Sequence, residues 1–208
     1  MKEKTVGLTG LLSVVILILS LLVFGVLNNQ FSFLNDFISM LGAKGQPNSV
    51  LFNFFGFVIV GFLLFLFGWG YGQLQNDRLL AILLSIFGLG FAVTAIPIDF
   101  DQETSPVSKA HIVSICIGLA FWFFGLSRMG SNPNLPQKIR KRANLTAGVL
   151  ATAMIGFTLG FWSMPITHRL IFGIVFGWTG WTSIELVLNK NKSSHAQAKI
   201  QGGNASLK

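Results

Sequence analysis

Seven side chains in this very apolar sequence are of the types that carry acid–base, nucleophilic or metal chemistry. They lie in three segments far apart along the chain: Asp36, Ser39, Asp99, Asp101, His111, His168 and Arg169. Two imidazoles with one or two carboxylates, and one position left open for water, make a usual catalytic zinc arrangement. The residue types therefore allow a divalent metal such as zinc as a cofactor. Its candidate ligands are His111, His168, Asp99 and Asp36.

The same residues allow two interpretations without a metal. A neighbouring acid, Asp99 or Asp101, could orient His111 as a general base. The nucleophile would then be Ser39 or Ser108. The other interpretation is structural, because carboxylates near helix N-termini and an arginine opposite an acid are ordinary dipole and ion-pair arrangements. No short motif such as His-x-x-x-His joins any two candidates, so a site would have to assemble across separate connections.

The elements that must position these residues are apolar runs of helical length. The chain has 208 residues, of which 52% are hydrophobic and only 11% are charged, and its mean hydropathy is +0.66. Soluble domains carry about 25% charged residues, and about 20 apolar residues cross a hydrocarbon core as a helix. Because the short alternating segments of a membrane barrel are missing, the sequence predicts an all-α polytopic integral membrane protein.

Six such runs are expected to form one transmembrane domain, a six-helix bundle, within residues 1–188. The runs cover residues 6–27, 50–71, 79–96, 107–126, 143–164 and 168–188. The remaining residues, 189–208, form a polar, basic tail without apolar periodicity. Such a tail is expected to be disordered.

The connections between the runs carry the candidate residues. Residues 28–47 alternate polar and apolar side chains, which indicates a segment lying along the membrane interface. An acidic loop, residues 97–106, ends in Ser105-Pro106, a pattern typical of an N-cap followed by Pro in the first helical position. Residues 165–167 are expected to form a short turn in which Thr167 caps the last helix.

Basic residues give this bundle an orientation. With the N-terminus in the cytoplasm, the only Lys and Arg residues left outside are Lys44, Lys109 and Arg169. This asymmetry follows the positive-inside rule, so we expect a multi-pass protein of the cell membrane (plasma or inner) with both termini cytoplasmic. The formal charge of +8 is then explained by membrane insertion and not by nucleic-acid binding. Membrane lipids are the expected partners, and the sequence identifies no protein partner.

Three further features bear on packing and chemistry. Glycines four residues apart allow membrane helices to approach closely, and they occur as Gly68/Gly72, Gly156/Gly160 and Gly173/Gly177. Glu185, one turn from the inner end of the last run, is expected to pair with Lys190 or to relay protons. A single cysteine, Cys116, excludes an intrachain disulfide.

Several short motifs together resemble the prokaryotic multi-pass membrane proteins of the domain of unknown function 998 family (DUF998). They are the stretch from Asn35 to Gly42, the stretch from Leu51 to Gly56, the acidic loop followed by His111, and His168-Arg169-Leu170. The resemblance spans most of residues 10–188. It implies a six-helix membrane protein and no established activity.

The sequence leaves three function classes open. The first is a structural or accessory membrane protein that assists envelope or lipid processes. The second is an outer-leaflet hydrolase or transferase acting on a lipid or lipid-linked head group, with or without a metal. The third is a small-solute transporter or sensor, which would need polar groups through the bilayer midplane, whereas the mid-helix positions here are mostly apolar.

Overall fold

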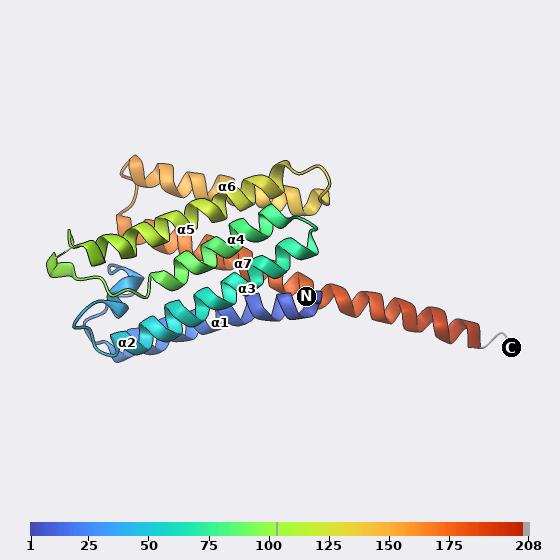
Figure 1. Cartoon of the computed structure of the whole chain (residues 1–208), viewed down its shortest axis with the longest axis horizontal. Helices are drawn as coiled ribbons and strands as arrows, with labels where there is room; N and C mark the ends of the chain where they lie inside the picture. The colour runs from blue at the N-terminus through green and yellow to red at the C-terminus, as the bar shows by residue number, and fades with distance from the viewer. Residues whose placement is uncertain (103, 206–208) are drawn as a thin grey trace.

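The apolar runs of the sequence become long helices that pack side by side (Figure 1). The computed structural model describes residues 1–102 and 104–205, with side chains as far as Leu188 except that of Asp101. No strand occurs in this described part, so the predicted all-helical class is confirmed. In chain order the elements are α1 (Glu3–Leu27), η1 (Ile38–Gly42), α2 (Ser49–Phe52), η2 (Asn53–Ile59), α3 (Val60–Leu74), α4 (Arg78–Val93), η3 (Phe100–Gln102), α5 (Pro106–Ser131), α6 (Gln137–Thr158) and α7 (Met164–Ala205).

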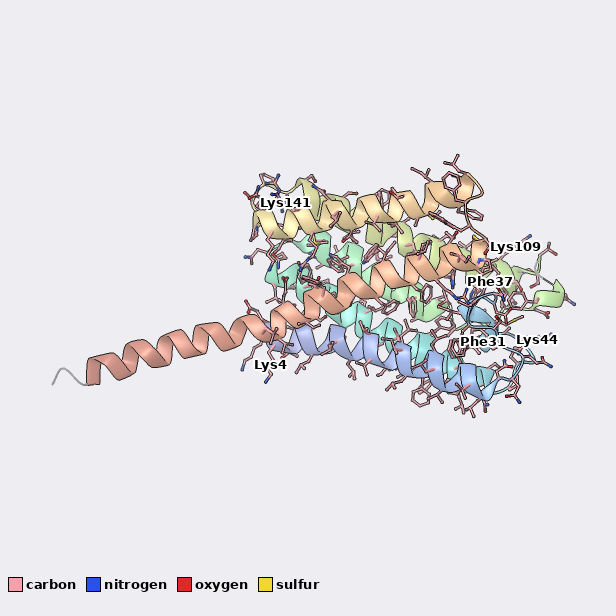
Figure 2. All side chains as sticks on the ribbon, turned by 180° about the vertical axis from the view of Figure 1, so that it is seen from behind. Lys4, Phe31, Phe37, Lys44, Lys109 and Lys141 are labelled. Carbon is pink, nitrogen blue, oxygen red and sulfur yellow. The ribbon has the colours of Figure 1, made fainter. Side chains whose placement is uncertain are left out.

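The helices close into a ring. Going round it, α1 contacts α3, α3 contacts α4, α4 contacts α5, α5 contacts α6, α6 contacts α7, and α7 returns to α1. The two ends of the bundle are identified by the residues that lie at each. Lys4 and Lys141 lie at one end, and Phe31, Phe37, Lys44 and Lys109 lie at the other (Figure 2). The end that carries Lys4 and Lys141 is the one predicted to face the cytoplasm, and the opposite end is called the outer end below.

Within the described residues, four helices are long and apolar enough to cross a membrane. They are Glu3–Leu27, Ser49–Leu74 (α2, η2 and α3 together), Pro106–Ser131 and Met164–Leu188. Helix α4 is apolar but shorter. Helix α6 has sufficient length, but its first turns hold Lys138, Arg140, Lys141 and Arg142, which lower its hydropathy. The chain is therefore a helical protein with several helices fit for a bilayer.

The ends of α6 differ from those predicted. The helix begins at Gln137, six residues before the expected apolar start, because Lys and Arg are good helix formers and nothing after Pro136 interrupts them. It ends early, at Thr158, where Gly160 adopts a left-handed conformation with φ of +74°. The amide of Phe161 donates to the Gly156 carbonyl and that of Gly160 to the Phe157 carbonyl, which is the Schellman pattern of helix termination.

The last helix is longer than predicted at both ends. It starts at Met164, because Pro165 in the first turn lacks only an N–H group that would have no helical partner there. Thr167 is therefore inside the helix and not its cap, and its hydroxyl donates to the Ser163 carbonyl at 3.0 Å. At the other end the helix continues past Leu188 to Ala205, through residues expected to be disordered. No proline follows Leu188, and the first glycine is Gly202.

The second apolar run contains a π-helical segment. Element η2 (Asn53–Ile59) carries the wider π turn between the α-helical pieces α2 and α3. At its start, buried Asn53 donates from Nδ2 to the Gly42 carbonyl at 2.8 Å. This bond fixes η1, in the first connection, against the second membrane helix.

Glycines hold α3 and α4 together. A Cβ atom added to Gly68 would lie 2.6 Å from the Leu84 carbonyl carbon, and one added to Gly72 would lie 2.3 Å from the Ala81 Cα. The close approach predicted for this pair is confirmed. Nothing lies within 4 Å of a Cβ added to Gly173 or Gly177, so that pair makes no such contact within the described chain. In the remaining pair, Gly156 and Gly160, the second glycine lies past the end of α6 and terminates that helix.

Candidate functional site

A large, mainly apolar cavity runs from the outer end of the bundle inward between three helices. It has a volume of about 820 Å³ and lies between α5, α6 and α7, with residues of the first connection and the acidic loop at its outer end. Its long walls carry side chains such as Phe123, Leu150 and Met154. Many ligand pockets have volumes of about 300–1,000 Å³ and combine apolar walls with a few polar groups. The cavity is therefore large enough for a lipid-like ligand.

The polar groups of this cavity are few and lie together. Ser39, His111, Thr167 and His168 contribute side chains to its lining, and three of them were candidates from the sequence. They come from η1, α5 and α7. The bond from Asn53 to the Gly42 carbonyl holds η1 in its place. The cavity thus has one end with hydrogen-bonding groups and a long apolar remainder.

His111 is held by the loop before its own helix. Its Nδ1 lies 2.8 Å from the Ile96 carbonyl oxygen, so Nδ1 carries the proton and donates it, because a carbonyl only accepts. The residue is 6% exposed, and its ring contacts Phe57 edge-on at 6.3 Å. The imidazole is therefore fixed in one orientation at the cavity wall.

His168 has no such anchor. Its ring lies between Phe37, with centroids 5.7 Å apart, and Phe172, at 4.6 Å. Its Nδ1 is buried and has no hydrogen-bond partner in the described part of the chain. Buried polar nitrogens are nearly always paired, so this atom calls for a partner that the described residues do not supply.

Asp99 and Ser108 are used in closing the acidic loop. The Asp99 carboxylate accepts a hydrogen bond from Lys44 Nζ at 3.0 Å. Its amide donates to Ser108 Oγ at 3.1 Å, and that oxygen lies 3.3 Å from the Asp99 carbonyl. The predicted N-cap is confirmed, because Ser105 Oγ accepts from the Ser108 amide. The side chain of Asp101 lies outside the described side chains.

Asp36 and Arg169 hold the first connection onto α7. Arg169 donates from Nε to the Phe33 carbonyl at 2.6 Å, from Nη1 to the Pro165 carbonyl at 2.9 Å, and from Nη2 to the carbonyls of Ser32 and Asp36. The Asp36 carboxylate accepts from the Ser32 amide at 2.7 Å. Neither side chain lines the cavity. Both residues act on the fold that covers it.

The four candidate metal ligands do not gather. Among the residues that the structure describes, no group of three or more His, Cys, Asp and Glu side chains could hold a metal ion. His111 and His168 line the same cavity, whereas Asp99 binds Lys44 and the Asp36 carboxylate turns back to Ser32. The Asp36 carboxylate is thus held within its own connection, and the Asp99 carboxylate by a lysine of the first connection.

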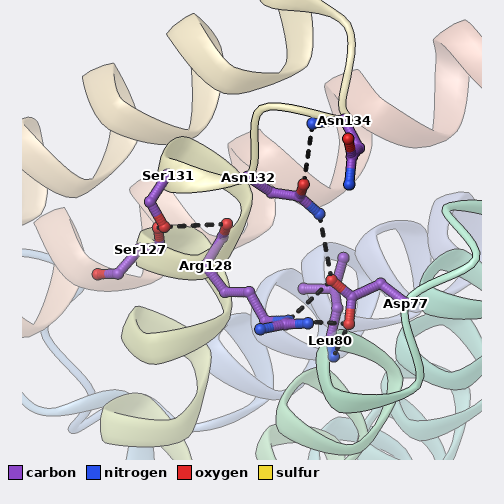
Figure 3. A network of polar contacts seen from close by, with 7 residues as sticks. All are labelled: Asp77, Leu80, Ser127, Arg128, Ser131, Asn132 and Asn134. Carbon is purple, nitrogen blue, oxygen red and sulfur yellow. Dashed lines mark hydrogen bonds and ion pairs between the residues drawn. The ribbon is translucent and has the colours of Figure 1, made fainter.

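The acids at the inner end form networks that the sequence did not reveal. Asp77 caps α4 by accepting from the Leu80 amide at 3.0 Å, and both its oxygens lie 2.8 Å from Arg128 Nε (Figure 3). Burial, the largest influence, raises the pKa of Asp77, but the bonds from Arg128 and the Leu80 amide together lower it below the usual value. An acid directly before an apolar run is a sequence signal for a helix N-cap, so the capping role of Asp77 could have been predicted. Its partner Arg128, 51 residues away on α5, could not.

Glu185 pairs with two basic residues of α6. The partner predicted for it, Lys190, lies outside the described side chains. The Glu185 carboxylate contacts Arg142 Nη1, accepts from Lys138 Nζ at 2.6 Å and from the Trp181 indole at 3.2 Å. These contacts connect the basic start of α6 to the inner part of α7. Glu185 therefore serves the packing of two helices in the described structure.

Comparison with known proteins identifies a family and no individual relative. A family model described as "Protein of unknown function (DUF998)" matches residues 11–185. No curated protein and no solved structure matches the chain.

Proposed function

The chain belongs to the DUF998 family of proteins of unknown function, and we propose that it is an accessory protein of the cell membrane that holds the apolar chain of a membrane lipid. The observation that carries this proposal is the apolar cavity of about 820 Å³ between α5, α6 and α7. Burial of a methylene group contributes about 0.8 kcal/mol, so a cavity of this size and composition binds a long hydrocarbon chain in preference to a polar solute.

The proposal places six helical spans in the bilayer, with both termini in the cytoplasm. Helices α4 and α6 occupy places in the same ring as the four apolar spans. At 1.5 Å per residue, α4 is about 24 Å long and α6 about 33 Å long, close to the hydrocarbon thickness of about 30 Å. Reporter fusions after Lys208 and within residues 102–105 should then report opposite compartments. Two fusions on the same side would refute this topology.

Aromatic side chains pack beside the cavity and on toward the inner end of the bundle, which favours holding a ligand over transporting one. Ring contacts lead inward from His168, each between neighbouring residues of the series Phe172, Phe176, Phe91, Phe87, Trp122, Trp178 and Tyr71. A transported solute would have to displace this packed series. A bound lipid needs only the space that is already open between α5, α6 and α7.

The proposal is tested by filling the cavity. Ala120 lines the cavity. Ala110 lies ten residues earlier on the same helix, α5, and does not line it. The protein is purified in a mild detergent, incubated with bacterial lipid extract, and its bound amphiphiles are counted by native mass spectrometry. Ala120→Trp should lose the bound lipid and Ala110→Trp should retain it. A wild-type protein without bound amphiphile, or equal retention by both variants, would refute the proposal.

A second candidate function is hydrolysis or group transfer on an outer-leaflet lipid. It is favoured by one observation, that Ser39, His111 and His168 line the same cavity. No hydrogen bond joins Ser39 to either imidazole in the described structure, so nucleophile activation would require a movement on ligand binding. A lipid-turnover screen with wild type and Ser39→Ala, alongside elemental analysis for zinc, separates this candidate from the accessory role.

A further inference from the structure

Resting on the proposed lipid-binding role, we infer that the cavity selects single-chain amphiphiles with an uncharged, hydrogen-bonding head, such as a monoacylglycerol or a long-chain alcohol. The inference comes from two side chains at the outer end of the cavity that make no hydrogen bond within the described chain. They are the imidazole of His168 and the hydroxyl of Ser39.

His168 supplies one donor and one acceptor. A neutral imidazole carries a proton on one nitrogen and a lone pair on the other, and the ring lies against Phe37 and Phe172. Its buried Nδ1 has no partner in the described chain. Ser39 is 9% exposed, and its hydroxyl makes no hydrogen bond to another described residue. A hydroxyl or ester group of a ligand can satisfy both without bringing a charge.

The cations near the cavity are already engaged or face away from it. The guanidinium of Arg169 donates to four backbone carbonyls of the first connection and of its own helix. Lys44 binds Asp99, and Lys109 is exposed on α5 and does not line the cavity. A phosphate or carboxylate at the polar end would therefore be desolvated without a counter-charge, which is strongly unfavourable.

Size and shape agree with one chain. The polar lining residues Ser39 and His168 lie at the outer end of the cavity, and its apolar wall extends along α5 and α6. A head group bound by His168 and Ser39 thus places the attached chain along Phe123 and Met154. Charge and position together determine the class of ligand.

The test compares three probes of equal chain length by competition in native mass spectrometry: hexadecane, 1-monopalmitoylglycerol and palmitoyl lysophosphatidic acid. The uncharged glycerol ester should bind at least about tenfold more tightly than the anionic lipid, which corresponds to about 1.4 kcal/mol. His168→Phe keeps an aromatic ring between Phe37 and Phe172 but removes the hydrogen bond. It should weaken the glycerol ester about fivefold to tenfold and leave hexadecane binding unchanged.

The outcomes separate the two proposals. If none of the probes binds, the proposed lipid-holding function fails. If hexadecane binds but the anionic lipid equals or exceeds the glycerol ester, the function stands and the inferred ligand class is overturned. Equal binding of the glycerol ester to wild type and His168→Phe overturns the assignment of His168 as the group that binds the head.

Discussion

The contact between α3 and α4 should be destroyed by adding a single methyl group at Gly88. A Cβ atom at this position would lie 2.2 Å from the backbone nitrogen of Phe65 and 2.6 Å from its Cα. Both atoms belong to the backbone of α3, so no side-chain rotation can relieve the overlap. The two helices would have to separate, and the neighbouring glycine contacts at Gly61 and Gly68 would open with them.

The magnitude follows from two opposing effects. Replacing a glycine inside a helix by alanine stabilises the helix by about 1 kcal/mol. Overpacking a well-packed interior destabilises by about 1–3 kcal/mol, and occasionally by more. Because the contacted atoms are backbone, the overlap should lie at the upper end of that range, which leaves Gly88→Ala less stable by about 2 kcal/mol. Gly173→Ala is the matched control, since nothing lies within 4 Å of its added Cβ.

The assay is unfolding of purified protein in mixed micelles, with increasing SDS and with temperature. Gly88→Ala should unfold at lower SDS and at a thermal midpoint several degrees lower, whereas Gly173→Ala should equal or exceed wild type because it keeps only the helix-propensity gain. If Gly88→Ala were as stable as Gly173→Ala, the close α3–α4 contact would not exist in the protein, and the ring of helices would need another arrangement.

Three further predictions concern polar residues. Asp77→Asn should destabilise by about 1–2 kcal/mol at pH 7, a value reduced because Arg128 is 40% exposed. Since the pKa of Asp77 is lowered in the folded protein, the difference from wild type should be complete above about pH 4 and should disappear as the pH falls further, as measured by thermal unfolding across pH. Arg169→Lys keeps the charge but loses the planar fork, so proteolysis within residues 28–47 should accelerate while the helices remain intact. Glu185→Gln should destabilise more than Lys138→Ala in the same micelle assay, because Arg142 is 16% exposed and Lys138 is 76% exposed.

Several elements were predictable because their causes are local. Ser105-Pro106 begins a helix by a hydrogen bond between residues three apart, and the apolar runs form helices because backbone groups in lipid must pair within the segment. The predicted helix ends were wrong where apolar length alone does not set the end of a helix. The basic start of α6 is helical before its apolar part begins, and Gly160 ends that helix through a left-handed turn. The π segment at Asn53 has no period that a sequence pattern reveals.

By itself, the sequence determined the helical class, the candidate residues at one end and the family resemblance, because composition, apolar length and short motifs are properties of the chain. Only the tertiary structure decided which candidate residues lie at the same cavity. It brought Ser39, His111 and His168 to one cavity, and it bound Asp99 to Lys44 and Arg169 to backbone carbonyls. These partners lie far apart along the chain, and each side chain has several possible partners of suitable charge. Helix packing chooses among them, since it alone fixes which ends of the helices are neighbours.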